Sequence, residues 1–256
     1  MHNQSHEINS TEPIIKVDKL VKRFGNFEAN KSLCFHVDKG EIFGFLGANG
    51  AGKTTAMRIL SGLSKPTSGE VWVAGFNVNT HPESIKKNIG YMSQKFSLFE
   101  DLTIWENMRF FSAVYSMSKK QFKERGQELL QELGIWEERN RMVHDLSLGW
   151  KQKLAFTVAI MHKPAIVFLD EPTSGVDPIT RRQFWEMIYE ASAEGITVFV
   201  TTHYMDEAEY CNRVSIMVDG RIDALDTPEN LKKQFNALNM NEVFIKLARP
   251  AVNSSQ

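Results

Sequence analysis

Three short stretches of the chain are apolar at nearly every position: 41–47 (EIFGFLG), 165–170 (AIVFLD) and 196–203 (ITVFVTTH). Strands buried on both faces of a parallel sheet have such continuous apolar runs, whereas half-exposed strands alternate. Helical patterns follow the first two runs, near 53–62 and 179–194. Buried strands that alternate with helices predict an α/β sheet with right-handed crossovers.

Five other strand-like stretches carry more polar alternation. Such alternation is typical of strands with one solvated face, and it predicts an antiparallel β flank beside the parallel core sheet. The stretches are 14–17, 32–37, 70–74, 214–218 and 221–225.

Between Gln94 and Pro164 the sequence becomes dense in helical patterns. It begins with TIWE at 103–106, which matches a capping box at a helix N-terminus. It closes with a pattern that predicts an amphipathic helix, which Pro164 terminates because proline cannot continue a helix. We interpret this stretch as a helical subdomain inserted into the α/β core.

These patterns predict one folded domain between two irregular ends, where disorder usually concentrates. The domain spans 13–236, and its tail is expected to be irregular from about residue 240. The predicted parts are a disordered N-terminus (1–12), an α/β core (13–94 and 164–236), a helical subdomain (95–163) and a C-terminal tail (237–256).

Composition adds bounds on size and partners. The chain has 256 residues, 42% of them hydrophobic, which is enough for one domain with a substantial core. Its 30 Lys and Arg balance 31 Asp and Glu, giving a net charge of −1. Because no overall positive charge favours polyanions, we expect no nucleic-acid partner and no direct binding to an anionic membrane.

The chain also lacks the patterns of a membrane or secreted protein. No apolar run approaches the roughly 20 residues that cross a bilayer, and the polar start MHNQSHEINSTEP has no apolar segment of a secretory signal. We therefore expect the chain to be cytosolic. Cys34 and Cys211 are too few for a disulfide framework, and both are expected to be small buried hydrophobic residues.

A glycine-rich segment follows the first apolar run. GANGAGKT, residues 47–54, matches G-x-x-x-x-G-K-[ST] between a predicted strand and a predicted helix. Its backbone N–H groups can surround phosphate oxygens, and the helix N-terminus adds partial positive charge. Lys53 would reach the β- and γ-phosphates, and the Thr54 hydroxyl would bind Mg²⁺. The candidate nucleotide contacts here are Gly47, Asn49, Gly50, Ala51, Gly52, Lys53, Thr54 and Thr55.

Two acids follow the second apolar run. Asp170 ends the predicted strand, where a carboxylate can hold Mg²⁺ through its water shell. Glu171 points elsewhere and is a candidate to orient and deprotonate an attacking water. A pair of acids at a strand end more often only solvates that end, but the glycine-rich loop in the same chain favours the catalytic interpretation.

Five motifs stand in a fixed order along the chain, and together they resemble those of the ATP-binding subunit of an ABC transporter. The resemblance extends from about Ile14 to Phe235 and is greatest for bacterial ATPases of multidrug exporters of the ABC-2 type. It implies a P-loop ATPase that uses ATP and Mg²⁺. The motifs are GANGAGKT (47–54), YMSQ (91–94), LSLGWKQ (146–152), LDEPTSGVDP (169–178) and TTHYMDEAE (201–209).

The resemblance assigns roles to residues that the pattern alone leaves open. It implies that Gln94 contacts Mg²⁺ and the attacking water, and that His203 donates a hydrogen bond to the γ-phosphate. Phe24 falls where the family places an aromatic ring against the adenine. Alone, His203 would more often be an ordinary surface or core histidine, and Phe24 would more often be a core residue.

LSLGWKQ, which we call the signature loop, predicts a second anion site. Ser147 would cap the following helix, and the N–H groups around Gly149 would face an anion. The resemblance implies that two copies face head to tail, so that each signature loop closes over the ATP of the other copy. The contacts made in trans would be Ser147, Gly149, Gln152 and Asp177, with the loop 174–177 crossing the dimer interface.

The signature loop departs from the family pattern at two positions. Leu148 replaces the usual first glycine, and Trp150 replaces the usual glutamine. A side chain at Leu148 is compatible with function if its Cβ points back into the helical subdomain, but not if φ must be positive there. We expect function to survive, with rate and affinity affected.

The resemblance also implies partners and a location. The chain would act as a homodimer on the cytoplasmic face of the inner membrane, touching that membrane only through a separate ABC-2 type permease. Phe96 and Phe99, in the aromatic stretch 95–115, are candidates for contact with that permease.

Four other kinds of protein are weighed against an exporter ATPase. A ribosome-associated factor would show two cassettes joined by a charged linker, and a DNA-repair ATPase would show a long coiled-coil insertion. An importer ATPase often carries a C-terminal regulatory domain, for which the stretch after Pro228 is too short. A sensor that binds nucleotide without hydrolysis often lacks the acid at Glu171. The sequence favours the exporter ATPase.

Overall fold

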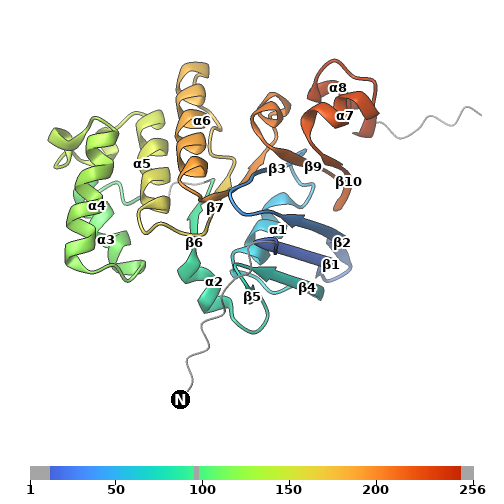
Figure 1. Ribbon diagram of the computed structural model, residues 1–256, viewed down its shortest axis with the longest axis horizontal. Coiled ribbons are helices and arrows are strands. Elements are labelled where there is room, and N and C mark those ends of the chain that lie inside the picture. The colour runs from blue at the N-terminus through green and yellow to red at the C-terminus, as the bar shows by residue number, and fades with distance from the viewer. Residues whose placement is uncertain (1–11, 95–97, 249–256) are drawn as a thin grey trace, which may run out of the picture.

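A computed structural model describes residues 12–94 and 98–248. Its centre is a six-stranded sheet in the order β10-β9-β3-β8-β7-β6 (Figure 1). The five strands from β9 to β6 are parallel neighbours, and only β10 runs antiparallel. The strands are β3 (Ile42–Gly47), β6 (Ile89–Met92), β7 (Ile166–Asp170), β8 (Thr197–Thr202), β9 (Arg213–Val218) and β10 (Arg221–Asp226).

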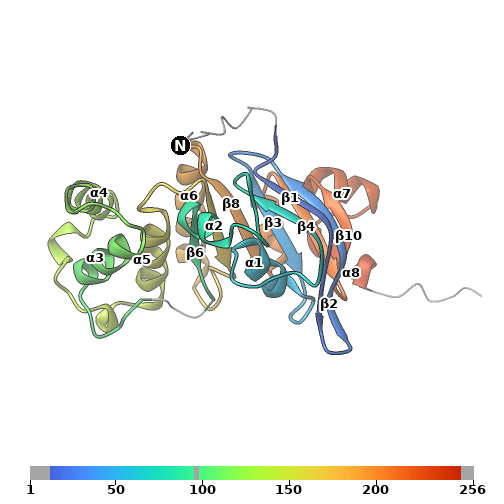
Figure 2. The same cartoon turned by 90° about the horizontal axis from the view of Figure 1, so that it is seen from below.

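A second, antiparallel sheet of four strands in the order β2-β1-β4-β5 lies to one side of the first (Figures 1 and 2). Helix α1 (Lys53–Leu60) packs with this sheet in one hydrophobic cluster. The strands are β1 (Ile15–Phe24), β2 (Phe27–Val37), β4 (Ser68–Val73) and β5 (Phe76–Asn77).

The apolar runs alternate between two hydrophobic clusters, which explains why they are continuous. Phe43 and Phe45 of β3 point into the cluster beneath the antiparallel sheet, together with Phe199 of β8. Ile42 and Leu46 of β3 point into the second cluster, with the helices on the other face. Because both faces of each central strand are buried, no polar alternation remains. The predicted fold class is confirmed.

The helical subdomain lies at the far end of the molecule from the antiparallel sheet (Figure 2). The predicted capping box is present, because the Thr103 side chain accepts from the N–H of Glu106 and the Glu106 carboxylate accepts from the N–H of Thr103. The elements of the subdomain are α3 (Ile104–Val114), α4 (Lys119–Glu132), α5 (Leu148–Ile160) and the short 3₁₀ helices Trp136–Glu138 and Val143–Asp145.

Helix α5 is not amphipathic, contrary to the prediction. Every residue from Leu154 to Ile160 is buried, because α5 packs against α3, α6 (Pro178–Ala193) and β6 at once. A helix enclosed on all sides has no polar face. The helix ends at Ile160, and Pro164 follows it as expected.

Three further expectations are wrong. The stretch 214–218 is not in the antiparallel flank: β9 is a buried parallel neighbour of β3. The tail is not irregular from 240, because α8 (Met240–Ala248) buries Met240 and Val243 against the 3₁₀ helix Met205–Tyr210 and β9. Cys34 is exposed, although Cys211 is buried as expected.

Several elements have no counterpart in the prediction. They are short or lie at the edges of the domain, where the pattern of hydrophobic and polar residues is weakest. They are β5, β6, α2 (Pro82–Asn88) and α7 (Pro228–Gln234). The division into domains stays a prediction, and the predicted disordered N-terminus lies, apart from Glu12, outside the described residues. Among the described residues, no helix is both long enough and apolar enough to cross a membrane.

Candidate functional site

The glycine-rich loop joins β3 to α1, and at two of its glycines the backbone approaches other parts of the chain closely. Gly52 has φ of 103°, and a Cβ there would stand 2.3 Å from the carbonyl oxygen of Ala29. A Cβ on Gly47 would stand 2.4 Å from the carbonyl oxygen of Met217. Only glycine fits these two close approaches. The backbone N–H groups at the start of α1 are thereby left facing the loop.

A pocket of about 340 Å³ opens on this loop. It brings together residues that are far apart in the sequence, including eight of the predicted site residues. Its lining consists of Phe27, Ala29, Asn49, Gly50, Gly52, Lys53, Thr54, Thr55, Gln94 and Glu171.

Lys53 is almost fully buried at the base of the pocket. Its Nζ donates to the carbonyl oxygens of Gly47 (2.8 Å) and Ala48 (3.1 Å) and lies 3.6 Å from Glu171 Oε1. Burial lowers the pKa of Lys53, and the carboxylates of Glu171 and Asp170 oppose that shift. The ammonium group is therefore held by acceptors that phosphate oxygens can replace.

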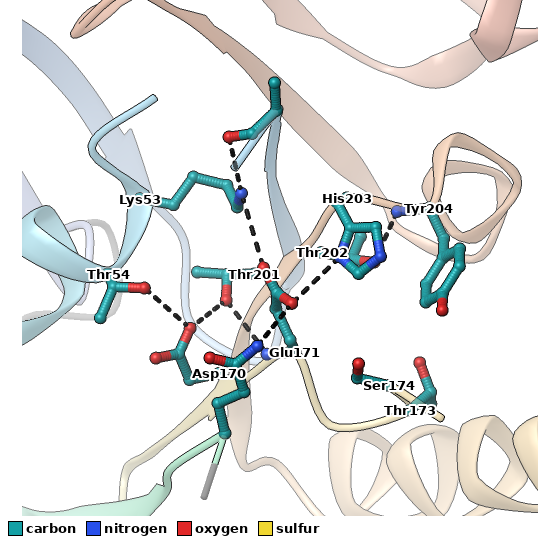
Figure 3. Close-up of polar contacts among 12 residues, drawn as sticks. Lys53, Thr54, Asp170, Glu171, Thr173, Ser174, Thr201, Thr202, His203 and Tyr204 are labelled. Carbon is teal, nitrogen blue, oxygen red and sulfur yellow. Dashed lines mark hydrogen bonds and ion pairs between the residues drawn. The ribbon is translucent and has the colours of Figure 1, made fainter. Parts of the chain in front are cut away.

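Glu171 is the point at which the site converges (Figure 3). Its Oε2 accepts a hydrogen bond from Nε2 of Gln94 at 3.0 Å and lies 3.0 Å from Nδ1 of His203, while Oε1 faces Lys53. Three side chains from three separate segments thus hold one buried carboxylate. Glu171 also has φ of 50°, a left-handed backbone that is uncommon for residues other than glycine. Such strain is often found at functional sites.

Asp170 ends β7 beside the phosphate loop, as predicted. Its Oδ1 accepts hydrogen bonds from the hydroxyls of Thr201 (2.6 Å) and Thr54 (3.4 Å). Burial raises the pKa of Asp170, against the effect of these hydrogen bonds. Thr201 was not predicted as a site residue. The signal that could have found it is its position, because Thr201 and Thr202 are polar residues at the end of an apolar strand, next to His203.

The signature-loop residues form a second group, and none of them contributes to the pocket described above. Ser147 occupies the N-cap position of α5, as predicted, but its side chain makes no capping hydrogen bond. Ser147 is an exposed residue. Gln152 is buried, and its Nε2 donates to the carbonyl oxygen of Ser174 at 3.2 Å, which ties α5 to the loop after β7.

Asp177 caps the neighbouring helix α6. Its Oδ1 accepts from the N–H groups of Ile179 and Thr180 at 3.0 Å each, and its Oδ2 accepts from the Thr180 hydroxyl at 2.6 Å. These hydrogen bonds lower the pKa of Asp177, so it is held as a carboxylate. The N-termini of α5 and α6 lie side by side, because Gly149 of α5 faces the side chain of Thr180 of α6.

Leu148 does not have the positive φ that would have excluded a side chain at this position; it is the first residue of α5. Its side chain is 40% exposed, and Cδ2 is 3.5 Å from where a Cβ on Gly175, in the loop after β7, would stand. Trp150 is partly buried against the core, with Nζ of Lys153 4.9 Å from its ring. Neither departure disrupts the helix.

Gly149 allows α5 to approach α6. A Cβ on Gly149 would stand 2.5 Å from Cγ2 of Thr180, closer than side chains tolerate. We expect Gly149→Ala to lower the free energy of unfolding by about 1–3 kcal/mol, the usual cost of overpacking, although alanine favours a helix. Chemical denaturation measures the loss. Thr180→Ser removes the clashing methyl group, so the double variant should recover most of it; a double variant as unstable as Gly149→Ala would refute this contact.

The candidate adenine and permease contacts stand apart from these groups. Phe24 is 55% exposed at the end of β1, so it is not a core residue. Phe99 is 45% exposed and its ring centroid lies 4.8 Å from that of Phe110. Phe96 lies outside the described residues.

A parallel sheet with a phosphate loop after one strand, β3, and buried acids at the end of another, β7, defines a P-loop nucleotide-binding protein. The family is more specific. The family model for ABC transporters matches residues 30–174, more than half of the chain. The chain therefore belongs to the ABC transporter family, as its ATP-binding cassette.

The sequences of two named relatives support the assignment to the ABC transporter family. The chain is 44% identical over 231 residues to the "Probable multidrug ABC transporter ATP-binding protein YbhF" of Escherichia coli, covering 90% of this chain and 40% of that protein. It therefore spans less than half of that relative. It is 32% identical over 245 residues to the "Linearmycin resistance ATP-binding protein LnrL" of Bacillus subtilis, covering 92% of this chain and 79% of that protein.

A solved structure adds information on assembly. The ATP-binding cassette MJ0796, in a dimeric post-hydrolysis state bound to ADP and Pi, superposes with a TM-score of 0.74 and 26% identity. The match covers 83% of this chain and 98% of that chain. Cassettes with this fold thus occur as dimers.

Proposed function

We propose that the chain is the ATP-hydrolysing motor subunit of an exporter. The observation that carries this proposal is the convergence of Lys53, Gln94 and His203 on the buried carboxylate of Glu171, beside the phosphate pocket. A buried acid held by hydrogen-bond donors at the edge of a phosphate site is suited to orient and deprotonate water.

Different residues of the site have different roles in phosphoryl transfer. The loop Gly47–Thr55 cradles the phosphates, and Lys53 neutralises charge on the β- and γ-phosphates. Glu171 acts as the general base on the attacking water. His203 and Gln94 hold Glu171 in place, and His203 donates a hydrogen bond to the γ-phosphate when ATP is bound.

The donor set fits Mg²⁺. The Thr54 hydroxyl, the Asp170 carboxylate and the Gln94 amide oxygen are hard oxygen donors, the kind that Mg²⁺ prefers, and Thr54 already contacts Asp170. Asp170 would act through bound water, as expected from the sequence. The metal would neutralise charge that develops on the phosphates. Among the described residues, no cluster of three or more His, Cys, Asp and Glu could hold it instead.

The second group of residues fits a dimer. Ser147, Gly149, Gln152 and Asp177 lie at the adjoining N-termini of α5 and α6, away from the pocket of their own chain. The N-terminus of α5, where Ser147 makes no capping hydrogen bond, carries partial positive charge, which suits the phosphates of ATP held by a second copy. A head-to-tail pair would then form two equivalent complete sites, and hydrolysis would release them.

The export function in this proposal is based on the relatives and not on the geometry of the site. The names of the E. coli and B. subtilis relatives refer to multidrug transport and to linearmycin resistance. By analogy, opening and closing of this dimer would drive an ABC-2 type permease, with the chain on the cytoplasmic face of the membrane. The exposed ring of Phe99, close to Gln94 in sequence, is the proposed contact with that permease.

Phosphate release from ATP tests this proposal. The purified chain, with and without its permease, should release phosphate in Mg-ATP and stop when EDTA removes the metal. A chain that binds Mg-ATP but releases no phosphate, even with the permease present, would contradict a motor function and favour a nucleotide-binding sensor.

A further inference from the structure

Glu207 is a fully buried acid that has no role in the site described above. It lies on the 3₁₀ helix Met205–Tyr210, four residues after His203, and its exposed fraction is 0%. It is not among the described residues that line the nucleotide pocket. Glutamate is almost never fully buried unless its carboxylate is paired. The partners of Glu207 therefore indicate what it does.

The contacts of Glu207 join three segments of the chain. Its Oε1 accepts a hydrogen bond from the hydroxyl of Thr173, which is 1% exposed and lies two residues after Glu171. Nε of Arg181, on α6, lies 3.5 Å from the same Oε1. Polar contacts that are shielded from water in this way are stronger than those at the surface. Glu207 thus connects the segment after β8 with the loop after β7 and with α6.

Arg181 contacts the segment of His203 at two further points. Its Nη1 lies 3.5 Å from Oδ2 of Asp206, and its guanidinium carbon lies 4.3 Å from the ring centroid of Tyr204. The ring of Tyr204 is in turn 4.1 Å, between centroids, from that of His203, its neighbour in the chain (Figure 3). Helix α6 therefore supports the residues on both sides of Glu207.

These contacts place the pair of Glu171 and His203 between two connections. On the strand side, the N–H of Glu171 donates to the carbonyl oxygen of Thr201 at 3.0 Å. On the loop side, the hydroxyl of Thr173 donates to Glu207. Between them, Oε2 of Glu171 lies 3.0 Å from Nδ1 of His203. Reacting groups need such support, because productive geometry tolerates displacements of only about 0.5 Å.

We propose that Glu207 is a positioning residue for ATP hydrolysis. Through Thr173 and Arg181 it fixes the segment that carries His203 against the loop that follows Glu171. This inference rests on the proposed hydrolytic function. Because Glu207 acts through other residues and lies outside the nucleotide pocket, its loss should slow hydrolysis and leave ATP binding unchanged.

Phosphate release and calorimetric binding of Mg-ATP, measured on the full chain where the wild type hydrolyses ATP, test the proposal. Thr173→Val, which removes the hydroxyl but keeps the shape of the side chain, should lower kcat at least about tenfold, because a displacement of about 1 Å can cost about 100-fold. KM and Kd should not change. Glu207→Ala should have the same effect. Glu207→Gln should keep most of kcat, because an amide oxygen can replace Oε1, which makes both contacts.

Glu209→Ala is the matched control. Glu209 is an acid on the same 3₁₀ helix, but its side chain is 38% exposed, and its Oε2 pairs with Nζ of Lys232 at 2.7 Å. This control should have the kcat and Kd of the wild type, because surface ion pairs contribute little. Melting temperatures establish that each variant is folded under the conditions of the assay.

Three results would overturn the inference. Wild-type kcat in folded Thr173→Val and Glu207→Ala would show that Glu207 is only a structural residue. Weakened ATP binding that accounts for the whole loss of activity would mean that Glu207 shapes the pocket. Glu207→Gln as slow as Glu207→Ala would contradict the role of the hydrogen bond from Thr173. A wild-type chain that releases no phosphate would instead refute the proposed function itself, and this inference with it.

Discussion

Replacing Glu171 with Gln should lower the rate of ATP hydrolysis at least about 100-fold, with ATP binding retained. The amide keeps the size of the side chain and can still accept a hydrogen bond from Gln94, but it cannot take a proton from water. It also removes a negative charge 3.6 Å from Lys53, so ATP affinity should hold or rise. Phosphate release and equilibrium binding of ATP measure the two effects separately.

Glu138→Gln is the matched control for this change. Glu138 lies on the surface of the helical subdomain, where its one ion-pair partner among the described residues is Arg141, so the control should hydrolyse ATP like the wild type. Hydrolysis by Glu171→Gln at the wild-type rate would remove Glu171 as the general base.

Replacing Lys53 with Ala should weaken ATP binding by about 100-fold or more and abolish measurable hydrolysis. The ammonium group is the buried cation at the phosphate loop, and charge-assisted hydrogen bonds to phosphate are among the stronger polar contacts. The change also leaves the carbonyl oxygens of Gly47 and Ala48 without this donor. Calorimetric titration with Mg-ATP measures the loss.

Lys87→Ala serves as the control for Lys53→Ala. Lys87 is an exposed residue of α2, and its removal should change neither binding nor melting temperature. A melting temperature for Lys53→Ala close to that of the wild type would show that the chain is folded. Wild-type ATP affinity in that folded variant would show that Lys53 does not bind the phosphates.

The phosphate site could be predicted from the sequence because its parts are local. A strand, a glycine-rich loop and a helix follow one another directly in residues 42–60, and Asp170 and Glu171 follow a single buried strand. The convergence of Gln94, Glu171 and His203 could not be derived from local pattern. It depends on the order of β6, β7 and β8 in the sheet, and only the family resemblance supplied it.

The errors share one physical cause, which is tertiary context. The stretch 214–218 has the polar Ser215 among apolar residues, as a flank strand would, but the pairing of β9 with β3 places it in the parallel core. The sequence of α5 predicts an amphipathic helix only if one face of the helix is assumed to be exposed. In the structure α3, α6 and β6 pack against the helix. Helix α8 is stabilised by buried Met240 and Val243, contacts that a local pattern cannot anticipate.

The molar mass of Glu171→Gln in solution, measured by size-exclusion chromatography with light scattering, tests most directly whether two chains complete each site. With Mg-ATP the variant should elute as a dimer, and without nucleotide as a monomer. Ser147→Arg in the same background should stay monomeric, because a bulky cation would occupy the space in which the signature loop meets the partner's ATP. A Glu171→Gln variant that binds Mg-ATP yet remains a monomer would contradict a nucleotide switch contained in this chain.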